Sequence, residues 1–139
     1  MDKIKVLFVC IHNSARSQMA EGFLSAIGGD RFCAWSAGIE RGQLNPDVVE
    51  AMKESGLDIS GKETKSVSEV IEKDFDYVIT VCDEASAERC PVFPGTAQKL
   101  HWGFPDPSAI SGSKDEKLEE TRSIRDQIKN KIECWIKEL

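Results

Sequence analysis

One short apolar stretch constrains this chain more than any other feature. Residues Val6 to Val9 form an uninterrupted apolar run with β-branched valine at each end, and the stretch ends at Cys10. Such a run is typical of a parallel strand that is buried on both faces. Residues 14–27 then have the pattern of a helix, which Gly28 and Gly29 close. We therefore expect a tight loop between strand and helix, and a strand, an amide-lined loop and a helix N-terminus together form a seat for an anion.

Two reactive side chains belong to this predicted seat. The thiolate of Cys10 would be a nucleophile, and a helix N-terminus, the nearby Arg16 and a hydroxyl such as that of Ser17 all favour the ionised form. The planar guanidinium of Arg16 fits two oxygens of a tetrahedral oxyanion, and also the transition state that follows attack. The alternative is a buried core cysteine at a strand end, which is common for this residue type. That alternative leaves Arg16 and the polar loop unexplained.

Further strands and helices alternate along the chain. We expect strands at 31–37, 77–81 and 97–102. One helix is expected after a cap formed by Asn45 and Pro46, and another from about Asp115. The capping box from Ser66 to Glu69 is expected to open a short helix through Val70 and Ile71. The side chains expected to face inward are Met19, Ala20, Phe23, Leu24, Ile27, Val48, Val49, Met52, Leu118, Thr121, Arg125, Ile128, Ile132, Trp135 and Ile136. This alternation predicts an α/β doubly wound fold, a single domain over 1–139 with a four-stranded parallel sheet and its ligand site at the carboxyl ends of the strands.

Charge and composition exclude several classes of partner. The net charge of −6 argues against nucleic acid and anionic membranes, because no basic stripe would neutralise phosphates. No apolar stretch has the length of a membrane span, and the first residues do not have a signal-peptide layout. We expect a cytoplasmic protein, in which five cysteines are more often catalytic, redox-active or metal-binding than structural.

A second pair of cysteines lies after the predicted strand at 77–81. Cys82 follows that strand directly, and Cys90 comes before Pro91 in a polar segment. The three thiols could pass a disulfide from Cys10 to Cys82 and then to Cys90, since each exchange needs only a thiolate attack on a neighbouring sulfur. A metal site of Cys82, Cys90 and His101 is an alternative that lacks an evident fourth ligand. A core role for Cys82 and an incidental surface position for Cys90 also stay open.

An aspartate follows the last predicted strand, in the run from His101 to Pro107. Asp106 lies between two prolines and could donate a proton to a leaving oxygen and later act as a base. The alternative is a turn aspartate before proline. We expect His12, His101 and Trp102 to line the site. Two other cysteines are interpreted as non-catalytic, Cys33 in core packing and Cys134 on the exposed side of the last helix.

The segment from Cys10 to Ser17 (Cys-Ile-His-Asn-Ser-Ala-Arg-Ser) resembles the phosphate loop of the low-molecular-weight protein tyrosine phosphatase superfamily. Its phosphatases usually carry an aromatic residue after the Asp-Pro pair, where this chain has Ser108, and often a second cysteine in the loop. The cysteine pair ending in Cys90-Pro91 and the His-Trp-Gly-Phe-x-Asp-Pro run instead resemble thioredoxin-coupled arsenate reductases. This resemblance covers essentially the whole chain.

The resemblance implies a mechanism. Cys10 attacks arsenate while Asp106 protonates the departing hydroxide, Cys82 then attacks Cys10 and releases arsenite, and Cys90 resolves that disulfide for reduction by thioredoxin. It implies an external reductant without a tightly bound cofactor, and we expect a monomer that also accepts phosphate or sulfate as mimics of arsenate. The residues expected to bind the oxyanion are Ile11, His12, Asn13, Ser14, Ala15, Arg16 and Ser17.

Some members of the superfamily bind potassium through residues that this chain partly shares. Asn13, Glu21 and Ser36 match, whereas Lys65 stands at the fourth, acidic place. We expect the Lys65 ammonium to replace the cation, with no metal bound and little effect of potassium on activity. The alternatives for the whole chain are a phosphatase for phosphotyrosine or aryl phosphates, and a non-catalytic oxyanion or redox sensor.

Overall fold

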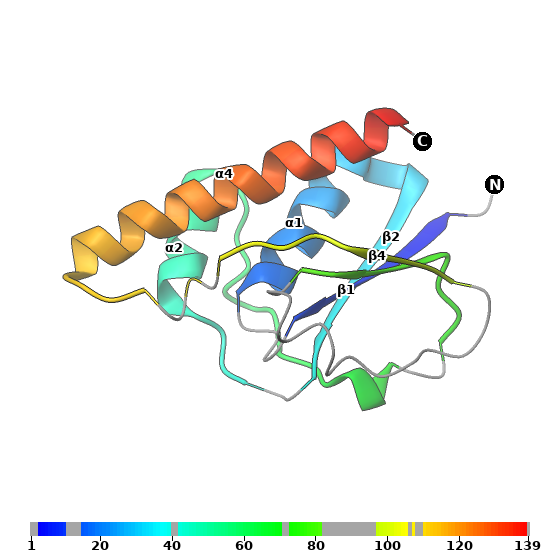
Figure 1. The fold of residues 1–139 in the computed structure, drawn as a ribbon, viewed down its shortest axis with the longest axis horizontal. Coiled ribbons are helices and arrows are strands. Elements are labelled where there is room, and N and C mark those ends of the chain that lie inside the picture. The colour runs from blue at the N-terminus through cyan, green and yellow to red at the C-terminus, as the bar shows by residue number, and fades with distance from the viewer. Residues whose placement is uncertain are drawn as a thin grey trace.

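The sheet has the predicted number of strands and the predicted parallel direction. A computed structural model of the chain describes residues 3–10, 15–39, 42–70, 73–81, 97–105, 107 and 110–138. Four parallel strands run through the described residues in the order β2-β1-β3-β4 (Figure 1). Their bounds are β1 Ile4–Cys10, β2 Phe32–Gly38, β3 Tyr77–Thr80 and β4 Gln98–His101. The predicted four-stranded parallel sheet is thereby confirmed.

Strand β1 lies at the centre of this arrangement and is buried on both faces, as its apolar run predicts. It pairs with β2 and with β3, so that Cys10 lies opposite Gly38 and Val9 lies opposite Thr80. Residues Val6 to Val9 are all fully buried. Phe8 faces the main core, while Leu7 and Val9 face a smaller apolar cluster on the other side.

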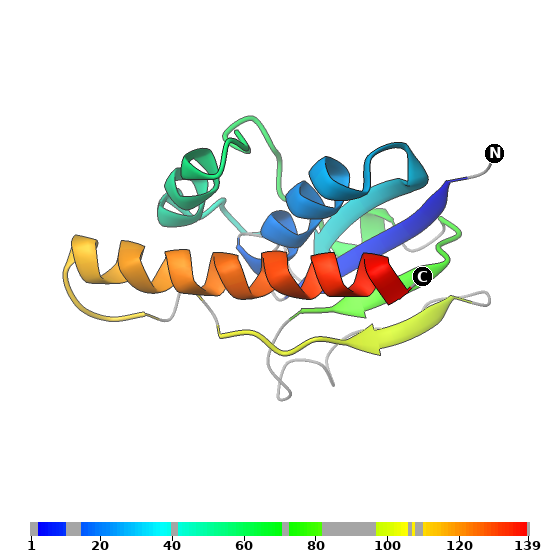
Figure 2. The ribbon, with the colours of Figure 1, turned by 90° about the horizontal axis from the view of Figure 1, so that it is seen from above.

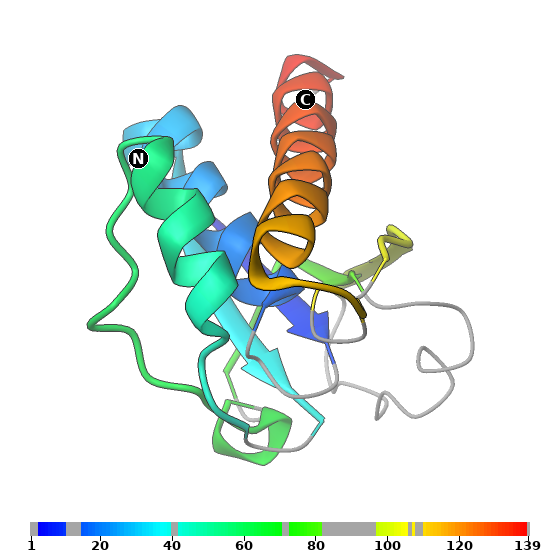
Figure 3. The same cartoon turned by 90° about the vertical axis from the view of Figure 1, so that its left-hand side faces the viewer.

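Three helices cover one face of the sheet: α1 Arg16–Gly28, α2 Pro46–Glu54 and α4 Lys114–Glu138 (Figures 1 and 3). Helix α4 runs along the length of the molecule and packs against both α1 and α2 (Figure 2). On the opposite face lies the short η2, Val67–Glu69, whose Val67 packs with Leu7 and Val9. None of the helices in the described part of the chain could cross a membrane.

Two predicted helix starts are confirmed by their hydrogen bonds. Asn45 Oδ1 accepts from the backbone N–H of Asp47 at 2.9 Å, with Pro46 as the first helical residue of α2. The backbone N–H of Ser66 donates to Glu69 Oε2 at 2.7 Å. This capping box opens only one 3₁₀ turn in the described residues, and Ile71 lies outside them.

The prediction for Ile27 is wrong. Its side chain is 39% exposed, because the inward position of the last turn of α1 belongs to Gly28, four residues after Leu24. A Cβ atom at Gly28 would lie 2.5 Å from Cδ2 of Phe32, so the Phe32 ring occupies that space. The other four predicted core residues of α1 are buried. In α4, Ile124 is a buried residue that the pattern missed, while Arg125 and Ile136 are only half-buried.

Cys33 is also placed differently from its predicted core position. It is half-buried and lines a cavity of about 240 Å³ together with Lys5, Trp35, Lys73 and Phe75. Cys33 lies opposite Lys5, near the amino ends of β1 and β2. The side chain therefore lies at the margin of the apolar cluster. Cys134 is exposed, as predicted.

Candidate active site

Cys10 ends β1 and lies against the first turn of α1. Its side chain is buried, and its Sγ is 2.9 Å from Oγ of Ser17, in a contact in which either atom could donate. The backbone carbonyl of Cys10 accepts from Ile39 N–H at 2.9 Å, which ties the strand end to the end of β2. The hydroxyl that the sequence analysis named thus lies in contact with the thiol. A thiolate at this position would receive a hydrogen bond from Ser17 and lie near the positive end of the α1 dipole.

Arg16 is the first residue of α1 and is almost completely buried, with 2% of its surface exposed. Its Nη1 donates to the backbone carbonyl of Phe104 at 3.1 Å. A buried guanidinium raises the energy of the fold unless acceptors surround it, and the Phe104 carbonyl is one such acceptor. Ala15, just before it, is buried, and its carbonyl accepts from Met19 N–H.

Several predicted site residues lie outside the described part of the chain. They are Ile11, His12, Asn13, Ser14, Cys82, Cys90 and Asp106. The described residues next to them lie at the carboxyl edge of the sheet. Val81, before Cys82, is buried and its N–H donates to Val9 O at 2.9 Å, while Trp102 N–H donates to Thr80 O at 2.7 Å. The chain thus enters the segments that carry Cys82 and Asp106 from the edge where Cys10 lies.

His101 and Trp102 have different environments at the end of β4. His101 is exposed, and its Nδ1 is 2.7 Å from Oγ1 of Thr80. Trp102 is buried, and its ring packs against those of Phe8 and Trp135. Trp102 is therefore part of the core. No group of three His, Cys, Asp or Glu side chains among the described residues is arranged to hold a metal ion.

A buried carboxylate in α1 has a cationic partner that sequence reasoning missed. The side chain of Glu21 is 5% exposed, and its Oε2 accepts from Nζ of Lys62 at 2.8 Å. Its Oε1 accepts from Ser36 Oγ at 3.2 Å, which brings together two of the residues predicted for the cation site. For Lys65, the third of them that the structure describes, the backbone carbonyl accepts from Gly38 N–H at 2.7 Å. The only sequence signal for Lys62 is that a buried acid requires a counter-charge from some nearby cation.

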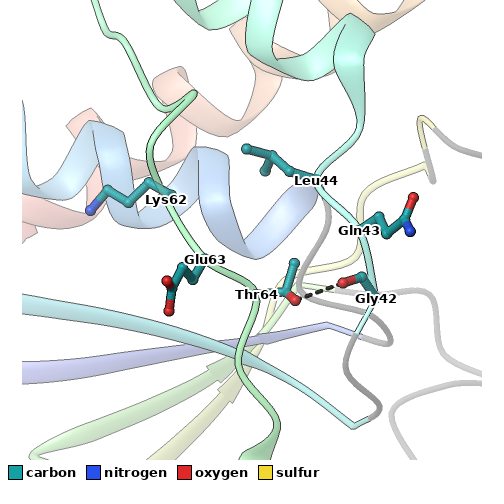
Figure 4. A pocket seen from close by; sticks show the side chains of 6 residues that line it. All are labelled: Gly42, Gln43, Leu44, Lys62, Glu63 and Thr64. Carbon is teal, nitrogen blue, oxygen red and sulfur yellow. Dashed lines mark hydrogen bonds between the residues drawn. The ribbon is translucent and has the colours of Figure 1, made fainter.

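Two hollows are lined in part by the segment that leads into α2. One, of about 520 Å³, is lined by residues 42–44 and 62–64, and Thr64 Oγ1 donates across it to the carbonyl of Gly42 at 2.6 Å (Figure 4). The other, of about 300 Å³, is lined by residues 43–47 together with Pro107, Ile110 and Lys117. Because Pro107 directly follows Asp106, the second hollow lies beside the segment of the predicted proton donor.

Comparison with known proteins decides the family. Residues 5–139 match the family described as low molecular weight phosphotyrosine protein phosphatase. The chain belongs to this family. The matched range begins in β1 and extends over the whole described sheet and all the helices of Figure 1.

Several proteins similar to this chain are arsenate reductases. The chain is 41% identical to an arsenate reductase of Halalkalibacterium halodurans over 135 residues, which cover 97% of this chain and 96% of that protein. A solved arsenate reductase in its phosphate-binding state matches with a TM-score of 0.79 and 34% identity, over 97% of this chain and 98% of the other. A thioredoxin-dependent arsenate reductase of Corynebacterium glutamicum matches with a TM-score of 0.65 and 29% identity, over 96% of this chain and 63% of the other.

Proposed function

We propose that this protein reduces arsenate to arsenite, with Cys10 as the nucleophile. The observation that carries the proposal is the identity of 41% to an arsenate reductase over nearly the full length of both chains. The buried contact between Cys10 and Ser17 and the buried guanidinium of Arg16 support it, because they suit a thiolate attacking an oxyanion. The phosphate-binding state of a similar reductase fits a seat that accepts phosphate as a mimic of arsenate.

The first step of the proposed reaction forms a covalent intermediate. Arg16 and the N–H groups of residues 11–17 hold arsenate, and the Cys10 thiolate attacks its arsenic atom. A sulfur–arsenic bond forms and an arsenic–oxygen bond breaks. The departing hydroxide takes a proton from Asp106 and leaves as water.

The second step of the proposed reaction transfers two electrons to arsenic. The Cys82 thiolate attacks the sulfur of Cys10, the electron pair of the sulfur–arsenic bond stays on arsenic, and arsenite leaves. Cys90 then attacks Cys82, which frees the Cys10 thiolate and leaves a disulfide between Cys82 and Cys90. Thioredoxin reduces this disulfide as an external dithiol, without a tightly bound cofactor. The thioredoxin-dependent relative supports this reductant. Because thioredoxin keeps thiols reduced in the cytoplasm, we propose the cytoplasm as the location. All three cysteines belong to one chain, so a monomer is sufficient for the chemistry.

The test is arsenate-dependent consumption of NADPH with thioredoxin and thioredoxin reductase. We expect sustained turnover by the wild type and none by Cys10→Ser, Cys82→Ser or Cys90→Ser. In a single turnover, Cys90→Ser still releases one arsenite and stops with Cys10 joined to Cys82. Turnover that persists in Cys90→Ser would contradict the relay. If the wild-type thiols are oxidised by one equivalent of arsenate and turnover then stops, the result would instead indicate a sensor.

A phosphatase is the second candidate, and the family description favours it. Arsenate and phosphate share shape and charge, so weak hydrolysis of an aryl phosphate fits both functions. Cys90→Ser separates the two, because hydrolysis needs Cys10 and Asp106 but no resolving thiol. The phosphatase is favoured if the wild type hydrolyses an aryl phosphate and reduces no arsenate.

A further inference from the structure

Glu21 places a carboxylate inside the molecule, one helical turn after the start of α1. Its side chain is 5% exposed, and each carboxylate oxygen accepts a hydrogen bond, Oε1 from Ser36 Oγ at 3.2 Å and Oε2 from Lys62 Nζ at 2.8 Å. We propose that Lys62 is a positioning residue that acts through Glu21, because its ammonium cancels a charge that would otherwise repel an oxyanion beside Cys10. This role rests on the proposed function, since an oxyanion beside Cys10 is part of that function.

Two independent observations place the Glu21 carboxylate near Cys10. On α1, Glu21 comes one turn after Ser17, whose Oγ is 2.9 Å from the Cys10 sulfur, and helical side chains lean toward the helix N-terminus. On the sheet, Ser36 lies opposite Phe8, which is two residues before Cys10 in β1. From the rise per residue and the spacing of parallel strands, Ser36 and Cys10 are about 8 Å apart. The carboxylate is therefore close enough for its charge to act on an anion beside Cys10.

The other charges near the site show why this neutralisation matters. Arg16 and Glu21 are the two buried charged side chains in the described part of the chain, and both belong to α1. Their opposite charges largely cancel for an anion that lies near both, and the net charge of −6 on the whole chain does not attract anions. With the Lys62 ammonium on Glu21, the sum of the three charges becomes positive. The N-terminus of α1 adds a partial positive charge of its own.

The fold holds Lys62 against α1 through its backbone as well as through its ammonium. The Lys62 N–H donates to the carbonyl of Ile59 at 3.0 Å, and the Ile59 side chain is buried in the main core. The next carbonyl, that of Glu63, accepts from Nε2 of the buried Gln18 at 3.2 Å. The Lys62 side chain extends over α1 (Figure 4). Because 45% of that side chain is exposed, these contacts place the ammonium and enclosure does not.

The test compares two alkylating reagents that differ in charge. Iodoacetate is an anion and iodoacetamide is neutral, and both react with the same thiolate, so the ratio of their rates reports the local field and is independent of the thiolate fraction. We expect Lys62→Met to lower the ratio of iodoacetate to iodoacetamide rates at Cys10 at least about threefold. An uncompensated unit charge about 8 Å away has an effect of this order or larger. Mass spectrometry of the Cys10 peptide from the full-length protein, alkylated in sodium buffer, measures both rates.

Removing the carboxylate as well should reverse this loss. In the double variant Glu21→Gln with Lys62→Met, we expect the ratio to return to within about twofold of wild type, since no uncompensated charge remains. Lys62→Arg keeps the positive charge and should also stay within about twofold. A purely structural effect of Lys62→Met would persist or grow in the double variant, and that outcome overturns the proposal. An unchanged ratio in Lys62→Met overturns it too.

Two further measurements locate the effect. Lys53→Gln removes the same charge from an exposed lysine of α2, and we expect its ratio to stay within about 1.5-fold of wild type, because solvent and salt screen an exposed charge. A fall equal to that in Lys62→Met would assign the effect to net charge and contradict the proposal. Inorganic phosphate, detected by its protection of Cys10 from iodoacetamide, should bind at least about threefold more weakly to Lys62→Met and normally to the double variant. Unchanged phosphate binding in Lys62→Met would exclude a role in oxyanion binding.

Failure of the proposed function gives a different result. Alkylation and phosphate binding need no arsenate reduction, so they test Lys62 even if the wild type loses no thiols with arsenate. In that case, the expected fall and recovery of the ratio would support the role of Lys62 while the reductase function fails. If arsenate is reduced and the ratio does not respond to Lys62→Met, the reductase function stands and the positioning role is wrong.

Discussion

Cys10 and Cys33 are free thiols on neighbouring parallel strands, and their surroundings differ in almost every respect. Cys10 lies at the carboxyl end of β1, buried, with its sulfur on the Ser17 hydroxyl and next to the first turn of α1. Cys33 lies near the amino end of β2, half-buried, in a cavity that Lys5 and Lys73 also line. Both thiols therefore have cations in their neighbourhood. The difference lies in how those cations are held.

The comparison leads us to expect that a buried and directed charge favours thiol chemistry more than a nearby exposed one. Arg16 is fixed by burial and by the Phe104 carbonyl, whereas the ammonium of Lys73 is exposed and lies 4.6 Å from the centre of the Trp35 ring. Solvent and salt screen an exposed ammonium and screen a buried guanidinium much less. The strand end also counts, because α1 is the next described element after the carboxyl end of β1, and a helix N-terminus favours negative charge. Chemistry is thus expected at one thiol and packing at the other.

The largest expected effect compares the two thiols directly. Cys10→Ser should lower arsenate reduction at least about 10³-fold, because Cys10 is the proposed nucleophile of the first step. Cys33→Ser should stay within about twofold of wild type. The measurement is thioredoxin-coupled consumption of NADPH at saturating arsenate. A loss of arsenate reduction in Cys33→Ser similar to that in Cys10→Ser would contradict the difference that we infer between the two thiols.

Ser17→Ala tests whether the hydroxyl contact distinguishes Cys10. Losing one hydrogen bond to a charged group costs about 1.5 kcal/mol, which corresponds to about a tenfold lower rate of the chemical step. The rate of arsenate-dependent thiol loss in a single turnover measures it. Ser25→Ala removes an exposed hydroxyl from the same helix and should have no effect. Equal rates in the two variants would show that the Cys10 to Ser17 contact does not support the nucleophile.

Lys62→Gln tests the second buried charge of α1, which is the carboxylate of Glu21. Removing the ammonium leaves Ser36 as the partner of the Glu21 carboxylate among the described residues. We expect a loss of about 1–2 kcal/mol in the free energy of unfolding in urea, limited by the partial exposure of Lys62. Potassium should restore part of this loss in the variant and leave the wild type unchanged.

The matched variant for this test is Lys65→Gln, which removes the cation that the sequence pattern predicted. A larger loss in Lys65→Gln than in Lys62→Gln would support the predicted role of Lys65. A strong activation of the wild type by potassium would contradict the expectation of an internal ammonium altogether.

The smallest expected effect concerns an ion pair between α2 and α4 that involves neither thiol. It provides a reference for changes in stability alone. Glu54 of α2 accepts hydrogen bonds from Arg122 of α4 at 2.7 and 2.8 Å, and this guanidinium lowers the pKa of Glu54 below its ordinary value. A lowered pKa in the folded state stabilises the protein above the ordinary range of the carboxyl group, and the gain disappears as the pH falls through the lowered pKa. Glu54→Gln should therefore slightly lower the Tm at neutral pH, with the difference vanishing in acid, and should not change activity. A difference that grows in acid would contradict this assignment.

The fold was predictable because its signals are local and agree with one another. The apolar run of β1, the Asn45 cap and the Ser66 capping box each determine one element without long-range information. Ile27 was misplaced because helical periodicity cannot show that Phe32 fills the space next to Gly28. The prediction of a core position for Cys33 was wrong because the residue pattern of a strand does not show how much of that face of the sheet other segments cover.

The site residues that could be predicted are those whose side-chain type alone indicates a chemical role. Cys10, Arg16 and Ser17 lie within eight residues, and the structure places them at one strand-to-helix junction. The partners missed by sequence reasoning act across long separations. Lys62 meets Glu21 from 41 positions away, and Phe104 contributes a backbone carbonyl, a group that every residue possesses. Such contacts depend on tertiary packing and have no local signature.

The order of synthesis gives the C-terminal helix a particular importance. The strand that ends in Cys10 is made first, yet the core on its α1 side is completed by Ile128, Ile132 and Trp135 near the end of the 25-residue α4. On the ribosome Cys10 is therefore synthesised long before the α4 residues that complete the core on this side of β1. A premature stop within α4 would yield a chain with every predicted catalytic residue and an unfinished core.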